Sequence, residues 1–225
     1  MFSITDFFLA AKSNPDVEFQ HGKNAVDAAK AAGVEHFVFV SVVDVEKAPA
    51  EVHHFHPKLK IETYLKSSGL AGYSILRPTC FYENLDDAAN WNPLKKGHVK
   101  FLMQEKLTWT STFDIGLAAA AMFKAPAEWQ GKTLDVVSWQ GDIADVAAGL
   151  AEVSGEPVGH SLAMPIFARR MFLNDLHHMC EMFAANGGGA PGSIDAFKKV
   201  VPTAMSAADF FRFHNKYADG TKIAK

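Results

Sequence analysis

Two predicted strands, about thirty residues apart, dominate the hydrophobic pattern of the chain. The first, Phe37–Val42, is a continuous apolar run rich in β-branched and aromatic residues, and the second is Tyr73–Arg77. Such runs are typical of strands that are covered on both faces of a sheet. The segment between them has apolar residues at helical spacing and ends before Gly69, a typical helix stop. The pattern therefore predicts a strand–helix–strand unit whose two strands are parallel neighbours.

The strand Phe37–Val42 is predicted to belong to a second strand–helix–strand unit as well. Phe2–Thr5 reads as a short strand, and Asn14 and Pro15 are a typical cap and first residue of a helix that ends at Gly33. The stripe of this helix predicted to be buried consists of Phe19, Gly22, Val26 and Ala29.

Beyond the second strand the pattern alternates, and after Val158 it becomes mainly helical. The predicted strands are His98–Met103, Leu107–Thr110 and Thr133–Ser138. The predicted helices are Asn84–Asn92, Phe113–Lys124, Asp142–Val153, Pro165–Ala185, Ser193–Val200 and Ser206–Tyr217. Asn186–Gly192 is predicted to be a flexible connection, because its glycines follow a helix and not the strand that a dinucleotide fingerprint needs. We therefore expect one α/β domain, with a parallel-sheet core over residues 1–157 and an α-rich C-terminal lobe over residues 158–225.

Composition narrows the class of protein but does not identify it. The chain has 225 residues, of which 48% are hydrophobic and 21% charged, as in an ordinary soluble globular protein. A net charge of −3 gives no electrostatic case for nucleic acid or an anionic membrane as a partner. Two cysteines without metal spacing favour a reducing compartment. No apolar run approaches the roughly 18 residues of a membrane span, and no signal peptide is evident, so we expect a cytoplasmic location.

The predicted topology brings polar residues to one edge of the sheet. Ligands of open parallel sheets bind beyond the carboxyl ends of the strands. Those ends are Ser41 and the turn Arg77–Phe81, and the segment His53–Lys58 lies between them in sequence.

At these residues a specific resemblance appears. The segments HFHPKLKIETYL and ILRPTCFYENL resemble the NmrA-like family of atypical short-chain dehydrogenase/reductases. That family places a Ser at the end of this strand, a Tyr or His four residues before a Lys, and an LRP-type turn before a Glu-Asn pair. The resemblance implies a Rossmann-type fold and NAD(H) or NADP(H) as cofactor. It implies catalytic roles for Ser41, His54 and Lys58, and cofactor contacts from Thr5, Lys58, Pro78, Thr79, Cys80 and Phe81.

Each of these residues also has a simpler interpretation. Ser41 would hydrogen-bond a substrate oxygen or only the local backbone, and Lys58 would hold ribose hydroxyls or be a solvated helix residue. His54 stands where other members carry a catalytic Tyr, and an imidazole relays protons at about pH 6.5. Because Pro57 is tolerated only in a first helical turn, the helix should start near Phe55–Pro57. The four-residue spacing then need not place His54 and Lys58 on one face.

A metal site is the weaker interpretation of this segment. His53, His54 and His56 lie close together, but no carboxylate or cysteine completes the spacing of a zinc site. We therefore expect no metal. Nothing near Cys80 in sequence indicates a reactive thiolate.

Part of the family pattern is not present in this sequence. The family opens with a strand, a glycine-rich phosphate turn and two βαβ units. The glycine-rich turn supplies much of the dinucleotide affinity in this fold, through hydrogen bonds to the pyrophosphate. Each such charge-assisted hydrogen bond is worth roughly 1.5–3 kcal/mol, so without them we expect dinucleotide binding to be weak or lost. The strand Phe2–Thr5 would then be an edge with Phe2 and Ile4 on it. Such edges recruit partners, so we expect the strand to be frayed, covered by the chain itself, or paired across a homodimer.

Three functions follow from this sequence. The first is an NAD(P)-linked oxidoreductase acting on a small, hydrophobic carbonyl or alcohol substrate. The second is a regulatory protein that senses the nicotinamide redox state without turnover, which the replacement of Tyr by His54 favours. The third is a cofactor-free isomerase or cyclase that uses the same cleft.

Overall fold

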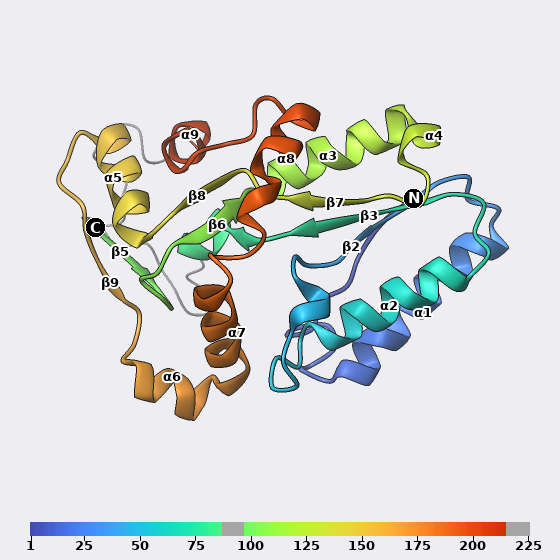
Figure 1. The fold of residues 1–225 in the computed structure, drawn as a ribbon, viewed down its shortest axis with the longest axis horizontal. Coiled ribbons are helices and arrows are strands. Elements are labelled where there is room, and N and C mark those ends of the chain that lie inside the picture. The colour runs from blue at the N-terminus through green and yellow to red at the C-terminus, as the bar shows by residue number, and fades with distance from the viewer. Residues whose placement is uncertain (87–96, 215–225) are drawn as a thin grey trace. The chain divides into compact units, whose positions relative to one another are not determined.

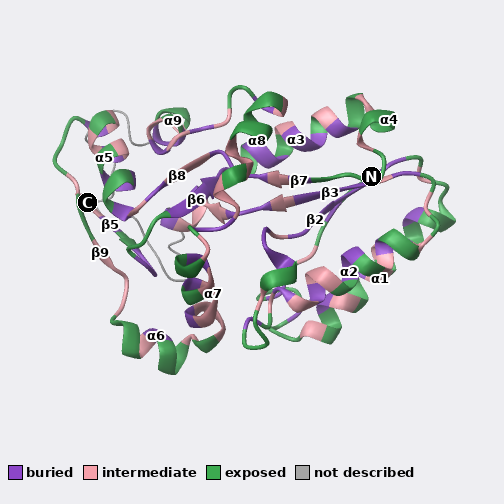
Figure 2. Ribbon diagram, in the orientation of Figure 1, coloured by how far each residue is buried: buried purple, intermediate pink, exposed green. Residues whose placement is uncertain are grey.

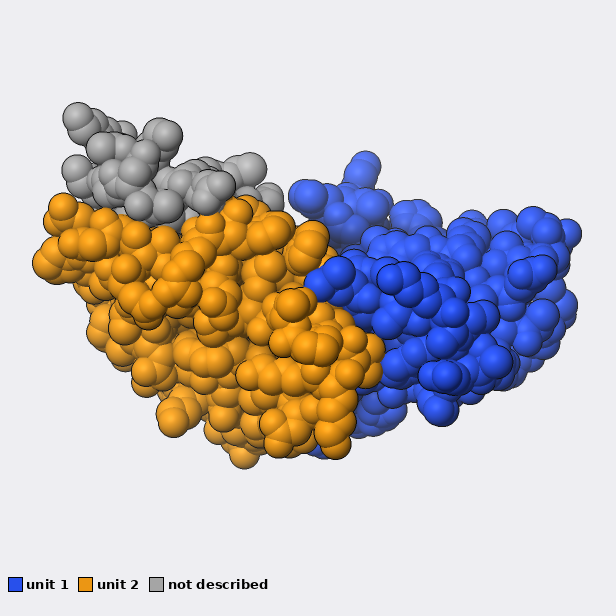
Figure 3. Space-filling view, turned by 90° about the horizontal axis from the view of Figure 1, so that it is seen from above, with its two compact units in different colours: residues 1–78, 115–136 blue, residues 79–114, 137–225 orange. Residues whose placement is uncertain are grey.

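The chain forms two compact units in the computed structural model, which describes residues 1–86 and 97–214. The first unit comprises residues 1–78 and 115–136, and the second comprises residues 79–114 and the chain from residue 137 onward (Figure 3). The predicted division between residues 157 and 158 lies inside the second unit. No described helix is long and apolar enough to cross a membrane.

The first unit is built on a parallel sheet. Its described strands are β1 (Phe2–Ile4), β2 (Phe37–Val40), β3 (Tyr73–Pro78) and β7 (Thr133–Val136), in the order β1-β2-β3-β7. All four residues of β2 are buried, as its uninterrupted apolar run predicts. The two overlapping βαβ units expected from the sequence are therefore confirmed, and with them the α/β class.

Helices cover both faces of this sheet (Figure 1). On one face lie α1 (Pro15–Ala31) and α2 (His56–Ser67), and on the other lie α3 (Thr112–Lys124) and the short α4 (Pro126–Trp129). The predicted cap of α1 is confirmed, because the Asn14 side chain accepts hydrogen bonds from two backbone amides of the first turn. A short 3₁₀ helix, η1 (Val45–Lys47), follows β2.

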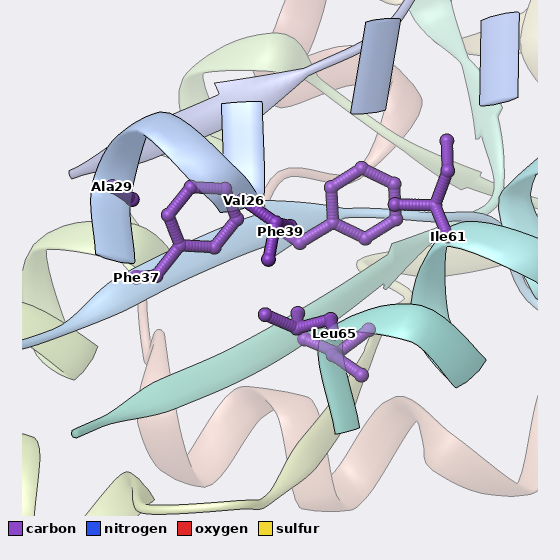
Figure 4. Packing of buried hydrophobic residues seen from close by; sticks show 7 residues of the cluster. Val26, Ala29, Phe37, Phe39, Ile61 and Leu65 are labelled. Atoms are coloured by element: carbon purple, nitrogen blue, oxygen red, sulfur yellow. The ribbon is translucent and has the colours of Figure 1, made fainter. Parts of the chain in front are cut away.

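Small residues let the two helices on the first face pack closely. A Cβ atom on Gly22 of α1 would lie 2.4 Å from the side chain of Ile61 in α2, so only glycine permits this contact. Figure 4 shows the apolar cluster that forms between these helices and the sheet. It consists of Val26, Ala29, Phe37, Phe39, Ile61, Leu65 and Ile75, each at most 1% exposed.

The second unit combines short strands with a set of helices. One sheet has the order β4 (Cys80–Phe81), β6 (Leu107–Thr110), β8 (Trp139–Gly141), and β5 (His98–Phe101) pairs in parallel with β9 (Gly159–Leu162). The helical elements are η2 (Tyr82–Asp86), α5 (Ile143–Ser154), α6 (Ile166–Phe172), α7 (Asn174–Ala185), η3 (Pro191–Ser193), α8 (Ile194–Val200) and α9 (Ala207–Phe213). The α-rich character expected of the C-terminal lobe is thus present.

Some predicted elements differ from the observed ones. The helix predicted over Pro165–Ala185 is two helices, α6 and α7, because the backbone leaves the helical region at Leu173 (φ −133°, ψ 51°). Much of α6 is exposed (Figure 2), and its exposed residues include the apolar Phe167 and Phe172. Most of the predicted helix Asn84–Asn92 and the end of Ser206–Tyr217 lie outside the described residues.

The glycine-rich stretch is more constrained than a flexible connection. Thr108 of β6 donates its backbone amide to the Gly188 carbonyl (3.0 Å), and Gln140 of β8 donates to the Gly187 carbonyl (2.7 Å). Gly188 has φ +97°, and a Cβ there would lie 2.5 Å from the Lys106 carbonyl oxygen. These bonds fix the loop against the sheet of the second unit.

The first strand forms the edge of the parallel sheet within the described residues. Phe2 is 44% and Ile4 57% exposed, so β1 is an ordered strand and not a frayed or covered one. The terminal amine of Met1 donates to the His36 carbonyl (2.6 Å). Of the three states expected for this edge, pairing with a second copy stays a prediction.

Candidate functional site

The register of the parallel sheet places the ends of three strands side by side. Val40 of β2 is paired with Ile4 of β1 and with Leu76 of β3. Thr5 and Ser41 therefore both follow directly after paired residues, at the carboxyl edge expected from the sequence. The backbone amide of Ser41 donates to the Leu76 carbonyl (2.7 Å), which fixes the strand end.

Lys58 belongs to a buried cluster at this edge. Its Nζ donates to the Thr5 carbonyl (2.6 Å) and Thr5 Oγ1 (2.8 Å) and forms an ion pair with Oε1 of Glu18 in α1 (2.8 Å). The Lys58 side chain is 13% exposed and that of Glu18 is fully buried. Burial lowers the pKa of Lys58, whereas the nearby charges of Glu18 and Asp6 oppose this effect.

A second buried cluster lies one turn further along α2, around Glu62. Arg77 of β3 donates from Nε to Glu62 Oε1 (2.8 Å) and from Nη2 to Oε2 (2.6 Å), a two-pronged ion pair. Arg77 also pairs with Glu46 of η1, so it ties a strand to two helices. Burial raises the pKa of Glu62, but the hydrogen bonds and charge of Arg77, the nearby Ser41 hydroxyl and the charge of Lys66 hold it below the ordinary value. Arg77 thus has a structural role that sequence analysis did not identify.

Ser41 lies beside this second cluster. Its hydroxyl is close enough to the Glu62 carboxylate to influence it, yet it forms no hydrogen bond of standard geometry within the described residues. Ser41 is 4% exposed. A buried hydroxyl without a hydrogen-bond partner can still donate its proton to a ligand.

His54 lies outside α2, as Pro57 predicted. The helix begins at His56, and the His54 ring packs against the rings of Phe7 (6.0 Å between centroids), Phe8 (5.4 Å) and Phe55 (4.8 Å). The four-residue spacing to Lys58 therefore does not place the two side chains on one helical face. A catalytic role for His54 stays a prediction.

The turn after β3 passes from the first unit into the second. Pro78 ends β3, and Thr79 Oγ1 lies 2.6 Å from Thr108 Oγ1 in β6. Burial strongly raises the pKa of Cys80 and raises that of Cys180 to about 11, so both thiols stay protonated at neutral pH. A cofactor contact from Cys80 stays a prediction.

The Glu-Asn pair that follows this turn has structural contacts. Glu83 Oε1 accepts from the backbone amide (2.8 Å) and the hydroxyl (2.6 Å) of Thr112, at the start of α3. The Asn84 side chain hydrogen-bonds the Cys80 thiol. The pair therefore stabilises a helix start and a buried thiol.

The other two histidines of the segment His53–Lys58 are His53 and His56, and both line a surface groove of about 780 Å³ between α1 and α2. Its lining residues include Phe19, His53, His56, Lys60 and Tyr64, but not Ser41, His54 or Lys58. Within residues 1–86 and 97–214, no group of three or more His, Cys, Asp or Glu side chains is placed to hold a metal ion.

Two of the site's acids, Glu18 and Glu62, were missed by sequence analysis. Helical spacing carried one usable signal, because Glu18 stands four residues before Gly22 in the same stripe as Val26 and Ala29. The buried face predicted from the sequence instead included Phe19, which is only half-buried.

Comparison with known proteins assigns this arrangement to a family. A model of the NmrA-like family matches residues 1–214. The chain belongs to the NmrA-like family. Festuclavine synthase II from Penicillium roqueforti is 29% identical over 151 residues, which cover 65% of this chain and 47% of the relative. The chain thus spans about half the length of the curated relatives it matches.

Solved NmrA-like structures share the fold. NmrA, a negative transcriptional regulator crystallised with NAD, superposes with a TM-score of 0.71 at 18% identity, covering 93% of this chain and 71% of NmrA. Triphenylmethane reductase of Citrobacter sp., complexed with NADP(H), has a TM-score of 0.68 at 17% identity, covering 94% of this chain and 75% of the reductase. At these identities the likeness establishes the Rossmann-like fold.

Thr5, Lys58 and Thr79 were predicted to contact a nicotinamide nucleotide, and their polar atoms bond other protein groups in this structure. Thr5 Oγ1 bonds Lys58 and Glu18, and Thr79 Oγ1 bonds Thr108. Lys58 has three partners for the three protons of an ammonium group. As placed, these side chains fit a nucleotide ribose only if one of the Lys58 bonds is exchanged.

Proposed function

We propose that this chain is an NAD(P)-linked oxidoreductase of the NmrA-like type that acts on a small, hydrophobic carbonyl or alcohol substrate. Family membership supports the nicotinamide link, and proteins of the same fold are complexed with NAD or NADP(H). The observation that carries the proposal is the Ser41 hydroxyl. It is buried at the carboxyl edge of the sheet, close to the Glu62 carboxylate, and it forms no hydrogen bond of standard geometry within the described residues. A substrate oxygen is the acceptor that would complete it.

The experiment that tests this proposal separates binding from turnover. NADPH is titrated against the full chain while the fluorescence of its four tryptophans is followed. Oxidation of NADPH is then measured by absorbance with a panel of apolar aldehydes, ketones and quinones. We expect binding that is weak but saturable, and turnover that falls at least about tenfold in Ser41→Ala with little change in NADPH affinity.

A matched serine variant provides the control. Ser67→Ala also removes a hydroxyl, but from the exposed end of α2, where Ser67 bonds only backbone carbonyls of its own helix. It should retain wild-type turnover. Equal activity of Ser41→Ala and Ser67→Ala would contradict the role of Ser41, and absence of NADPH binding to the wild-type chain would contradict the proposed function.

One observation favours a regulatory function as the second candidate. Lys58 Nζ has three protein acceptors at 2.6–2.8 Å, which leaves the lysine without a free donor for catalysis. A protein that binds the nucleotide and reports its redox state needs no proton relay. Saturable NADPH binding without oxidation by any carbonyl of the panel would favour this function.

A further inference from the structure

Glu18 is an acid in an unusual environment. Its side chain is fully buried, and Oε1 accepts a hydrogen bond from Thr5 Oγ1 (2.7 Å) and forms an ion pair with Lys58 Nζ (2.8 Å). The other oxygen, Oε2, is buried with no hydrogen-bond partner among the described residues. A desolvated carboxylate oxygen without a partner costs free energy, so the cluster as it stands is incomplete.

Lys58 is saturated in the same cluster. An ammonium group has three protons and no acceptor, and Thr5 and Glu18 together provide three acceptors at 2.6–2.8 Å. All three protons of the Lys58 ammonium group therefore face acceptors, whereas Oε2 of Glu18 still lacks a donor among the described residues.

We propose that Glu18 is a positioning residue that holds Lys58 in a closed state, and that a ligand hydroxyl engages Lys58 by replacing its bond to Glu18. This inference rests on the proposed function, in which the hydroxyl belongs to the ribose of a nicotinamide nucleotide. A hydroxyl is both an acceptor and a donor. One ligand hydroxyl can thus accept from Lys58 and donate to Glu18 Oε2, which satisfies the orphaned oxygen and keeps the two charges close.

The alternative is that the contacts of Lys58 with Thr5 and Glu18 only stabilise the packing of α1 and α2 near the end of β1. Both interpretations require that Glu18 acts on Lys58, and they differ in the effect of Glu18 on ligand affinity. The groups that face Lys58 are Glu18 from α1, Asp6 after β1, and the Phe39 ring of β2, whose centroid lies 6.0 Å from Nζ. Since Glu18 supplies the largest effect that opposes the burial-driven lowering of the Lys58 pKa, replacing it by Gln should lower that pKa further.

The closed state is tested directly by nuclear magnetic resonance of ¹³Cε-labelled lysine. The titration midpoint of Lys58, assigned by its loss in Lys58→Arg, is measured in the wild-type chain, in Glu18→Gln and in Asp27→Asn. The last is a matched control, because Asp27 is also an acid of α1 paired with a lysine, Lys23 (2.6 Å). We expect the midpoint to move to lower pH in Glu18→Gln and to stay unchanged in Asp27→Asn. An unchanged midpoint in Glu18→Gln overturns the inference.

Competition with a ligand is tested by NADPH affinity in the same variants. Glu18→Gln keeps a side-chain oxygen that can accept from the ligand hydroxyl but removes the charge that holds Lys58, so it should bind NADPH at least about tenfold more tightly than the wild-type chain, and Asp27→Asn should match the wild type. Equal or weaker binding in Glu18→Gln overturns the competition. If neither protein binds NADPH although the Lys58 midpoint shifts, the proposed function fails and the cluster is only structural.

A second variant guards against a folding defect. Thermal melting followed by circular dichroism shows whether Glu18→Gln is folded. If it is not, Thr5→Val removes one Lys58 acceptor with little change in shape, and tighter NADPH binding is again expected. Unchanged affinity in folded Thr5→Val overturns the inference.

Discussion

Two buried ion clusters lie one helical turn apart on α2, and they are completed to different degrees. In the Arg77–Glu62 cluster both carboxylate oxygens are bonded by a guanidinium that also reaches Glu46. In the Lys58–Glu18 cluster one carboxylate oxygen has no partner within the described residues. A completed cluster holds a fold together, whereas an incomplete one has an acceptor left for a further partner. We propose that this difference separates the structural from the functional part of the edge, because ligands of open parallel sheets bind beyond the carboxyl ends of the strands.

The largest expected effect is on the completed cluster. Arg77→Ala leaves the Glu62 carboxylate buried without its main partner, and should lower the free energy of unfolding by about 3–5 kcal/mol. Urea unfolding followed by circular dichroism measures this change. A loss below about 1 kcal/mol would contradict the assignment of Arg77 as the structural tie of the first unit.

Glu46→Ala is the internal control for this prediction. The Glu46 side chain is 53% exposed, so its pair with Arg77 is screened by solvent. Its removal should cost about 1 kcal/mol or less.

A somewhat smaller effect is expected for the incomplete cluster. Lys58→Met leaves Glu18 buried and uncompensated, and should cost about 3 kcal/mol in the same unfolding experiment. The double variant Lys58→Met/Glu18→Met removes both charges and should recover most of that loss, since well-packed apolar residues often replace a buried ion pair without penalty. If the double variant is no more stable than the single one, the two side chains do not act as a pair.

The smallest effect is a dependence of stability on pH. The pKa of Lys58 in the folded chain is lowered by burial, against the opposing charges of Glu18 and Asp6. Between this lowered value and the ordinary lysine value the unfolded chain binds more protons, so stability should rise with pH across that window. Arg77 stays charged throughout and adds no such slope, because Glu62 and Glu46 hold its pKa above the ordinary value.

Unfolding of the wild-type chain and of Lys58→Met is therefore compared from pH 8 to pH 10. The stability of the wild-type chain should increase relative to that of the variant as the pH rises. A difference that is constant, or that changes in the opposite direction, would show that Lys58 is not desolvated in the folded chain.

The sequence predicted the sheet better than it predicted the clusters. The strand β2 follows from an unbroken apolar run, β3 from a second mainly apolar segment, and the start of α2 from the fixed φ of Pro57. All three are local signals. The break between α6 and α7 at Leu173 carries no glycine or proline to mark it.

The acids of the site were hidden for a different reason. Glu18 finds its partner Lys58 forty residues further along the chain, and no local pattern distinguishes a buried acid from a solvated one. Lys58 itself was predicted as a site residue from the family motif. Its saturation by Thr5 and Glu18 depends on the sheet register and could be seen only in three dimensions.

The most direct test of the account is a crystal structure of the full chain with NADPH. We predict that Lys58 Nζ lies within hydrogen-bond distance of a ribose hydroxyl, that this hydroxyl also contacts Glu18, and that the Lys58–Glu18 bond seen at 2.8 Å is no longer present. A nucleotide bound at this edge with Lys58 still bonded to Thr5 and Glu18 would contradict the account.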